Sequence, residues 1–166
     1  MYNLKLKDVD SKFLGTNSDV IWQIIQSTPL FYYEGTNKVL TVEEEYEVLI
    51  RLTQVTEKFI RKYQDKVYWK DISLYQILSG DFIREFQDRL DWDYISRNQK
   101  LSESFIREFK YKVYWYNISK YQKLSEDFIR EFQDKVVWYC ISEYQTLSES
   151  FIREFQDRLD FQFDKF

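Results

Sequence analysis

The chain has 166 residues, a formal net charge of −4 at pH 7 and an aromatic content of 20%. A single cysteine excludes an internal disulfide, and the absence of histidine removes the commonest metal ligand and general base. Only 3 glycines and 1 proline are present, which disfavours turn-rich β folds and favours a mainly α-helical fold with a sizeable core.

The first 55 residues carry mixed helix and strand signals. The alternating segment MYNLKL is typical of a strand, and residues 31–40 resemble a hairpin. Residues 18–26 and residues 41–52 each predict a helix. We therefore expect residues 1–55 to form a small N-terminal α+β capping region.

One sequence motif repeats along the remainder of the chain, over residues 56–166. Its copies begin at phenylalanines that are 23 residues apart, namely Phe59, Phe82, Phe105, Phe128 and Phe151. A fixed period of this length is typical of a solenoid, in which each unit stacks on its neighbours. We number the columns of each unit from its phenylalanine, so that Phe105 occupies column 1 of the third unit and Trp115 occupies column 11.

The first part of each unit predicts a helix of about three turns. In the third unit, the apolar residues of columns 1, 2, 5 and 9 have spacings that place them on one helix face. A hydroxyl residue stands three positions before each phenylalanine, where it can cap the helix. These residues are Thr56, Ser79, Ser102, Ser125 and Ser148.

The second part of each unit predicts a shorter helix of about two turns, because Trp115, Ile118 and Gln122 have spacings of three and seven. We therefore expect an α-solenoid of five repeats, each with a long and a short helix. The aromatic C-terminus ends this array without a polar cap. We expect the tail to fold back over the last repeat in a monomer, and an end-to-end homodimer is the alternative.

Columns 1, 2, 3, 14, 15, 18, 20 and 21 barely change, and three of them are polar: column 3 is arginine, column 15 is serine and column 18 is glutamine. The glutamines could form a regular row that binds a ligand, or they could form hydrogen bonds with backbone groups at the corners of the repeat. We favour the second interpretation, because buried polar groups need hydrogen-bond partners. The arginines could bind the phosphates of a nucleic acid, or they could form ion pairs with acidic residues of the same helix face. Here too we favour the second interpretation.

Columns 10, 12, 13, 16 and 19 vary between units, at the corner before the second helix and along that helix. Drift at unconstrained surface positions would explain this variety, but it explains the many tyrosines less well, since tyrosine is typical of protein-binding surfaces. We therefore predict a partner-binding surface on these columns. Its residues are Tyr68, Tyr94, Tyr114, Tyr116 and Tyr139, with Lys120 and Lys123 at the rim.

The sequence contains no phosphate-binding loop, nucleophile elbow or cluster of metal ligands. We therefore expect a protein that is not an enzyme and that has no cofactor and no metal. No apolar stretch approaches the ~20 residues of a membrane span, and the N-terminal residues lack the apolar run of a secretory signal. These observations predict a cytoplasmic protein without a membrane segment.

The consensus W-x-x-I-S-x-x-Q-x-L-S-E-x-F-I-R-E-F runs from Trp115 to Phe132. Over residues 56–161 the chain resembles the tandem repeats of uncharacterised proteins of giant viruses, bacteria and phages, a resemblance that implies no activity and no catalytic residue. Such a chain is also similar to small phage products that disable host defence proteins. The resemblance implies a protein partner in the host cytoplasm, with a host immune nuclease of the CRISPR type as one candidate for inhibition.

Two other functions are alternatives. Single-stranded nucleic acid could stack its bases on the tyrosines and place its phosphates on Arg107, Lys110, Lys112, Lys120 and Lys123. However, residues 59–166 carry 18 basic and 19 acidic side chains, without the basic excess of a nucleic-acid-binding surface. The other alternative is a structural or assembly role through the aromatic C-terminus.

Overall fold

A computed structural model of the protein describes residues 4–6, 31–33 and 54–159. The described residues are mainly helical and form a helical repeat, as predicted. The chain divides into two compact units, residues 1–90 and 91–166, and each unit is described by itself.

Several predictions fall outside the described residues. They are the two N-terminal helices, the second arm of the hairpin and the fold-back of the C-terminal tail. The predicted boundary between residues 55 and 56 also stays a prediction.

The described part of the first unit contains a pair of short strands and three helices. Strand β1 (Leu4–Leu6) pairs antiparallel with β2 (Phe31–Tyr33), so the described part of the segment MYNLKL is a strand, as predicted. Helices α3 (Glu57–Lys62), α4 (Trp69–Tyr75) and α5 (Gly80–Glu85) follow.

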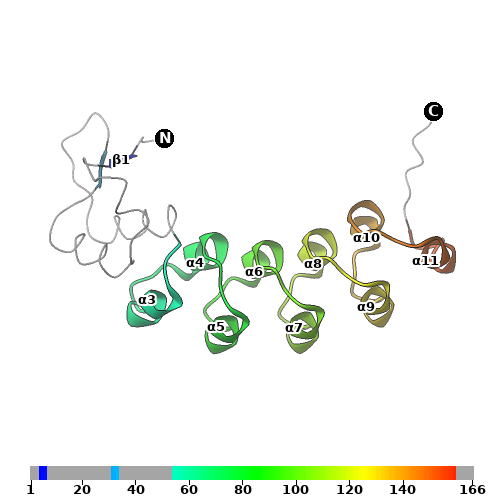
Figure 1. Ribbon diagram of the computed structural model, residues 1–166, viewed down its shortest axis with the longest axis horizontal. Coiled ribbons are helices and arrows are strands. Elements are labelled where there is room, and N and C mark those ends of the chain that lie inside the picture. The colour runs from blue at the N-terminus through cyan, green and yellow to red at the C-terminus, as the bar shows by residue number, and fades with distance from the viewer. Residues whose placement is uncertain (1–3, 7–30, 34–53, 160–166) are drawn as a thin grey trace. The chain divides into compact units, whose positions relative to one another are not determined.

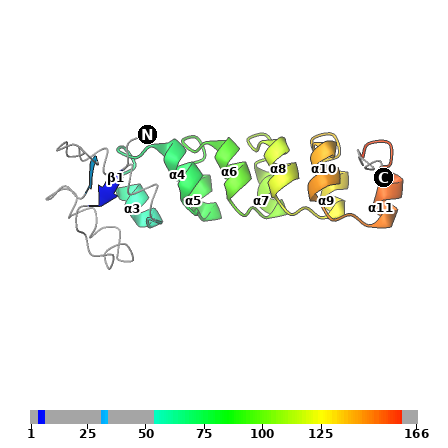
Figure 2. The same ribbon diagram turned by 90° about the horizontal axis from the view of Figure 1, so that it is seen from above.

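The second unit continues the alternation of helices led by tryptophan with helices that carry the column-1 phenylalanine. Figure 1 shows α6, α8 and α10 in one layer and α7 and α9 in another, and Figure 2 shows α6, α8 and α10 side by side with nearly parallel axes. Helix α8 packs against both α6 and α10. The helices of this unit are α6 (Trp92–Asn98), α7 (Glu103–Glu108), α8 (Trp115–Tyr121), α9 (Glu126–Glu131), α10 (Trp138–Tyr144) and α11 (Glu149–Glu154).

The prediction of a long and a short helix in each repeat was wrong, because α7 has 6 residues and α8 has 7. Helix α7 ends at Glu108, and its C-cap residue Phe109 leaves the helical region at φ −106° and ψ 25°. The chain then makes a turn, in which the N–H groups of Lys112 and Val113 donate to the Phe109 carbonyl at 2.8 and 3.0 Å. This turn, rather than a continued helix, carries the buried column-9 residue Val113 into the core.

The predicted caps are confirmed. The Ser102 hydroxyl accepts a hydrogen bond from the Phe105 N–H at 3.2 Å, and the other four hydroxyl residues make the same bond. In addition, Glu103 accepts a hydrogen bond from the N–H of Ser125 at 2.6 Å. The carboxylate of a capping box normally belongs to the capped helix, but here it comes from the preceding repeat.

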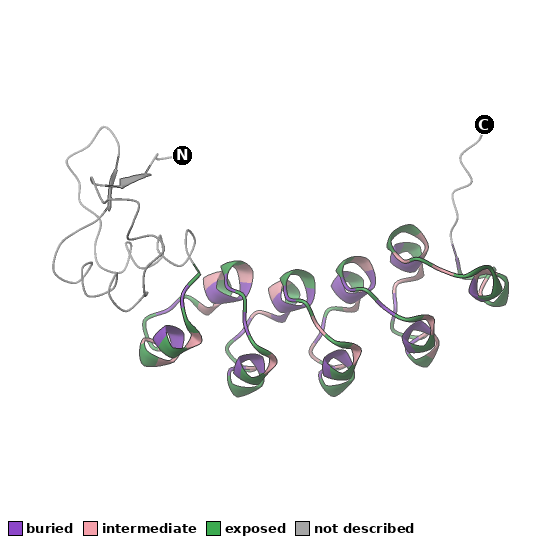
Figure 3. Cartoon of the chain, viewed as in Figure 1, coloured by how far each residue is buried: buried purple, intermediate pink, exposed green. Residues whose placement is uncertain are grey.

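Aromatic rings join each repeat to the next one. The ring centroid of Trp115 lies 6.3 Å from that of Phe128 and 5.0 Å from that of Phe132. The Trp115 indole N–H also donates to the carbonyl of Lys110 at 3.1 Å, which fixes the orientation of the ring. Buried residues lie on the helix sides that face the other layer, and the outer sides of the helices are left to solvent (Figure 3).

Candidate protein-interaction surface

The column-18 glutamines bond backbone groups of the preceding repeat, as predicted. The Gln122 side-chain nitrogen donates to the carbonyls of Ser96 and Gln99 at 2.9 and 2.8 Å, and its oxygen accepts from the Leu101 N–H at 3.0 Å. Gln145 makes the same three bonds one repeat further on. These side-chain amides form hydrogen bonds that hold neighbouring repeats together, so they do not form a row that binds a ligand.

The column-15 serines have a similar structural role. The Ser119 hydroxyl donates to the Trp115 carbonyl at 2.7 Å and accepts from the Val137 N–H at 2.9 Å. The Ser96 hydroxyl accepts in the same way from the Tyr114 N–H at 3.0 Å. Each buried serine therefore holds the start of the next tryptophan-led helix in place.

The column-3 arginines form ion pairs, as predicted. Arg107 donates to Glu131 of the next repeat at 2.7 Å and lies 3.7 Å from Glu103 of its own helix. Its guanidinium also lies 5.0 Å from the ring centroid of Phe128. Equivalent pairs between repeats are made by Arg61 and Arg130.

Column 8 is also part of the scaffold. Lys112 lies 6.0 Å from the ring centroid of Trp92, and Arg158 lies 5.6 Å from that of Trp138. Two of the five cations of the nucleic-acid alternative, Arg107 and Lys112, are thus engaged in contacts between repeats.

A group of tyrosines surrounds one cation on the exposed side of α8 and α10. The Lys120 Nζ lies 5.7 Å from the ring centroid of Tyr116 and 5.4 Å from that of Tyr121, both on α8. On α10, the ring centroid of Tyr144 lies 4.9 Å from the same nitrogen. We define the tyrosine–lysine face as Tyr116, Lys120, Tyr121, Tyr139, Glu143 and Tyr144.

Hydrogen bonds within this face fix the protonation of its members. A bond with Tyr144, followed by one with Tyr116, holds the pKa of Lys120 above its ordinary value. A hydrogen bond to Glu143 raises the pKa of Tyr139 to about 12. The same bond and a second from Tyr144 lower the pKa of Glu143. At neutral pH the face therefore presents one cation and one carboxylate beside Tyr139 and Tyr144, whose raised pKa values keep their hydroxyls protonated.

The structure brings together three of the seven predicted site residues, Tyr116, Lys120 and Tyr139. Tyr114 is 55% exposed at the start of α8, and Tyr68 is 62% exposed at the start of α4 in the first unit. Tyr94 is half-buried on α6, and Lys123 is exposed after α8. Their contribution to binding stays a prediction.

Column 13 is only partly a surface column, because Asp71 and Tyr94 are half-buried and the next two members are buried. In this column Asn117 is 6% exposed and Cys140 is fully buried, and burial raises the pKa of the Cys140 thiol. The Asn117 amide donates to the carbonyl of Asp93 at 3.0 Å. At Asn117 and Cys140 this column is therefore part of the scaffold and does not offer an exposed side chain to a partner.

The sequence analysis missed Tyr121 and Tyr144 of the face. Both are 43% exposed and belong to column 17, which is tyrosine in three of the four complete units. A nearly constant column resembles scaffold when repeats of one chain are compared. The available signal was position in the sequence, because Tyr121 and Tyr144 each directly follow a residue of the variable column 16, namely Lys120 and Glu143.

Tyr111 was likewise not predicted from the sequence; it is 83% exposed and lies outside the face. The other four units have aspartate in its column, and one of these, Asp134, pairs with Arg158 at 3.9 Å. In the third unit the ion pair is replaced by a contact of 5.4 Å between Lys135 and the Tyr111 ring.

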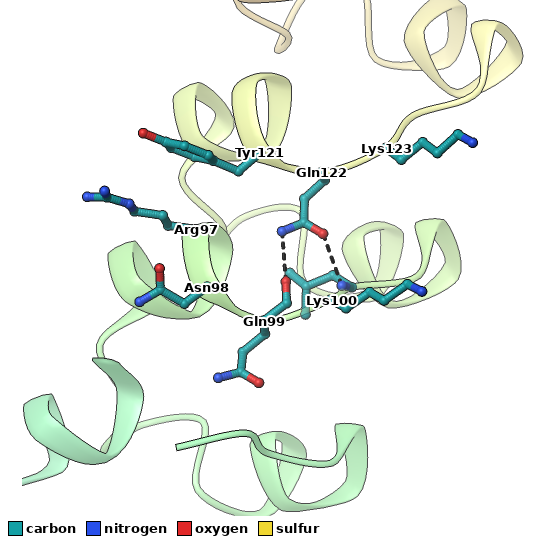
Figure 4. Close-up of a pocket in the computed structure, with 8 residues that line it drawn as sticks. Arg97, Asn98, Gln99, Lys100, Tyr121, Gln122 and Lys123 are labelled. Carbon is teal, nitrogen blue, oxygen red and sulfur yellow. Dashed lines mark hydrogen bonds between the residues drawn. The ribbon is translucent and has the colours of Figure 1, made fainter. Parts of the chain in front are cut away.

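An open pocket of about 510 Å³ lies between the corner after α6 and the corner after α8. Its walls carry Arg97, Lys100 and Lys123 together with Tyr121, and Gln122 crosses it (Figure 4). Since Tyr121 belongs to both, the pocket adjoins the tyrosine–lysine face.

Residues 4–6, 31–33 and 54–159 contain no group of three or more histidine, cysteine, aspartate or glutamate side chains that could hold a metal ion. The helices formed by these residues do not have the length and apolar character of a membrane span. No protein-family model, curated protein or solved structure matches the chain.

Proposed function

We propose that the protein is a non-catalytic binding scaffold whose tyrosine–lysine face contacts a protein partner. The observation that carries this proposal is a group of four tyrosines, each 43–51% exposed, on two adjacent helices. Three of them contact the Lys120 cation, and the fourth, Tyr139, is bonded to Glu143. Tyrosine offers a large amphipathic contact area with few rotatable bonds, so little conformational entropy is lost when a partner binds.

Rigidity supports the same proposal. The helices that carry the face are joined by the bonds of Gln145 to the carbonyls of Ser119 and Gln122. The face is therefore organised before binding, and the contacts with a partner do not have to offset the cost of ordering it. These bonds do not involve the side chains of the variable surface columns. Those side chains can therefore differ between repeats, and with them the contacts offered to a partner, while the bonds between the helices stay the same.

The proposal is tested by changing Tyr116 and Tyr139 together to alanine. The tagged full-length chain captures partners from host lysate, and quantitative mass spectrometry compares the wild type with the double variant. We expect the Kd of the partner to rise about tenfold or more, because aromatic anchors contribute most of the energy of an interface.

The matched control is Tyr111→Ala, which removes a more exposed tyrosine from outside the face. It should leave capture unchanged, and neither variant should lower the melting temperature by more than a few degrees, since the residues are exposed. Equal capture by the wild type and the double variant would exclude the face as the binding site.

A host immune nuclease of the CRISPR type is one candidate partner, by analogy with the small phage products to which such a chain is similar. A bound scaffold would inhibit it either by steric blocking or by holding an inactive conformation. A cleavage assay with purified nuclease tests this candidate: the wild-type chain should inhibit cleavage, and the double variant should do so only at a higher concentration.

A further inference from the structure

The pocket between the corners after α6 and α8 contains positive charge that the scaffold does not use. Among the described residues, the side chains of Arg97, Lys100 and Lys123 form no ion pair, and Arg97 has a single contact, 5.2 Å from the ring centroid of Tyr121. By contrast, the scaffold arginine Arg107 is paired with a glutamate at 2.7 Å. The three cations of the pocket are therefore available to a ligand.

The arrangement of the charges indicates the shape of that ligand. Arg97 and Tyr121 lie on one side of Gln122, and Lys100 and Lys123 lie on the other side (Figure 4). Gln122 itself is bonded to the backbone of the preceding repeat through both ends of its amide. A ligand that uses all three cations must therefore be extended and must carry acidic groups at two places.

We propose that the pocket binds an acidic peptide segment of the protein partner, an inference that rests on the proposed function. A volume of about 510 Å³ is within the range of ligand pockets and can hold a few side chains. The guanidinium can bind a carboxylate through two parallel hydrogen bonds, and the two lysines supply point charges. Because Tyr121 also belongs to the tyrosine–lysine face, one partner can occupy both.

A nucleic acid is the less suitable occupant. Residues 91–166 carry 12 basic and 14 acidic side chains, so this unit as a whole does not attract a polyanion over a long range. Three local cations suit a short run of carboxylates, for which close contacts are sufficient.

The test uses the full-length chain and fluorescence anisotropy of labelled hexaglutamate at low ionic strength. The double variant Lys100→Gln with Lys123→Gln and the single variant Arg97→Gln remove the charges from the two sides of the pocket. Both variants should fold, because columns 16 and 19 hold uncharged or acidic residues in other repeats, namely Leu74, Ile77, Glu143 and Thr146.

A matched control, Lys110→Gln with Lys135→Gln, removes the same number of lysine charges outside the pocket. We expect saturable binding to the wild type, a loss of about tenfold in the double pocket variant and binding within about twofold of the wild type in the control. Equal losses in the pocket and control variants, or equal binding of hexaglutamine, would overturn the proposal.

Labelled hexathymidylate is the second probe. If it binds more tightly than hexaglutamate and is weakened by the same pocket variants, the pocket is a nucleic-acid site and the proposal fails. The variant with Tyr116 and Tyr139 changed to alanine separates the two proposals. Retained hexaglutamate binding together with undiminished partner capture in that variant would support the pocket while excluding the tyrosine–lysine face.

Discussion

At the scale of single residues, Lys120 organises the tyrosine–lysine face. Its ammonium group lies within 5.7 Å of three tyrosine ring centroids, and its hydrogen bonds with Tyr144 and Tyr116 raise its pKa. Exposed cation–ring contacts are individually weak, at about 0.5–1 kcal/mol, so their effect is to orient the rings rather than to stabilise the fold. The side chains that define the face are therefore ordered by one another.

The residue scale supplies a prediction about pH. The pKa of Tyr139 is raised to about 12 because its hydroxyl donates to the Glu143 carboxylate. Since this folded-state pKa lies above the ordinary value of about 10, the bond stabilises the fold below that pH, and the stabilisation is lost as the pH rises through the folded value.

The change Glu143→Gln should return the Tyr139 pKa toward its ordinary value. An NMR titration that follows the tyrosine Cζ resonances measures this shift, with Tyr111 as an internal reference outside the face. An unchanged titration of Tyr139 in the variant would show that Glu143 does not accept its hydrogen bond.

At the scale of the repeat element, the glutamine of column 18 joins successive repeats. Gln122 satisfies one backbone N–H and two carbonyls at a corner where Gln99 and Ser96 are buried. Buried backbone groups without partners cost about 1–3 kcal/mol each. The Gln122 side chain therefore contributes to the free energy of unfolding, because it is the hydrogen-bond partner of these three backbone groups.

The change Gln122→Ala should lower the free energy of unfolding by about 2–4 kcal/mol, because three bonds between repeats are lost at once. Urea denaturation followed by circular dichroism measures the difference. The control is Gln133→Ala, because Gln133 donates its side-chain bond only within its own repeat, to the Arg130 carbonyl at 3.3 Å. A loss no greater than that of the control would contradict the role of column 18.

Much of the repeat element could be predicted because its signals are local. The hydroxyl of Ser102 caps a helix that begins one residue later, and the spacing of Trp115, Ile118 and Gln122 identifies the second helix. The end of α7 at Glu108 could not be predicted in this way, since the apolar face continues through the turn to Val113. The spacing of apolar residues indicates which side chains face the core, but it does not show whether helix or turn backbone positions them.

At the scale of the whole molecule, the candidate site was only partly predictable. Variation between repeats indicated Tyr116 and Tyr139, but it cannot distinguish exposure from contact with a neighbouring repeat. Cys140 is buried although its column varies, and Tyr144 is exposed although its column is nearly constant. The exposure of each column depends on how repeats stack, which a single repeat does not contain.

The most direct test of the central claim is hydrogen–deuterium exchange of the full-length chain with and without a captured partner. We predict slower exchange on binding in peptides that cover α8 (Trp115–Tyr121) and α10 (Trp138–Tyr144), and unchanged exchange in peptides that cover α7 and α9. Slower exchange confined to α7 and α9, with α8 and α10 unaffected, would contradict the proposal that the tyrosine–lysine face binds the partner.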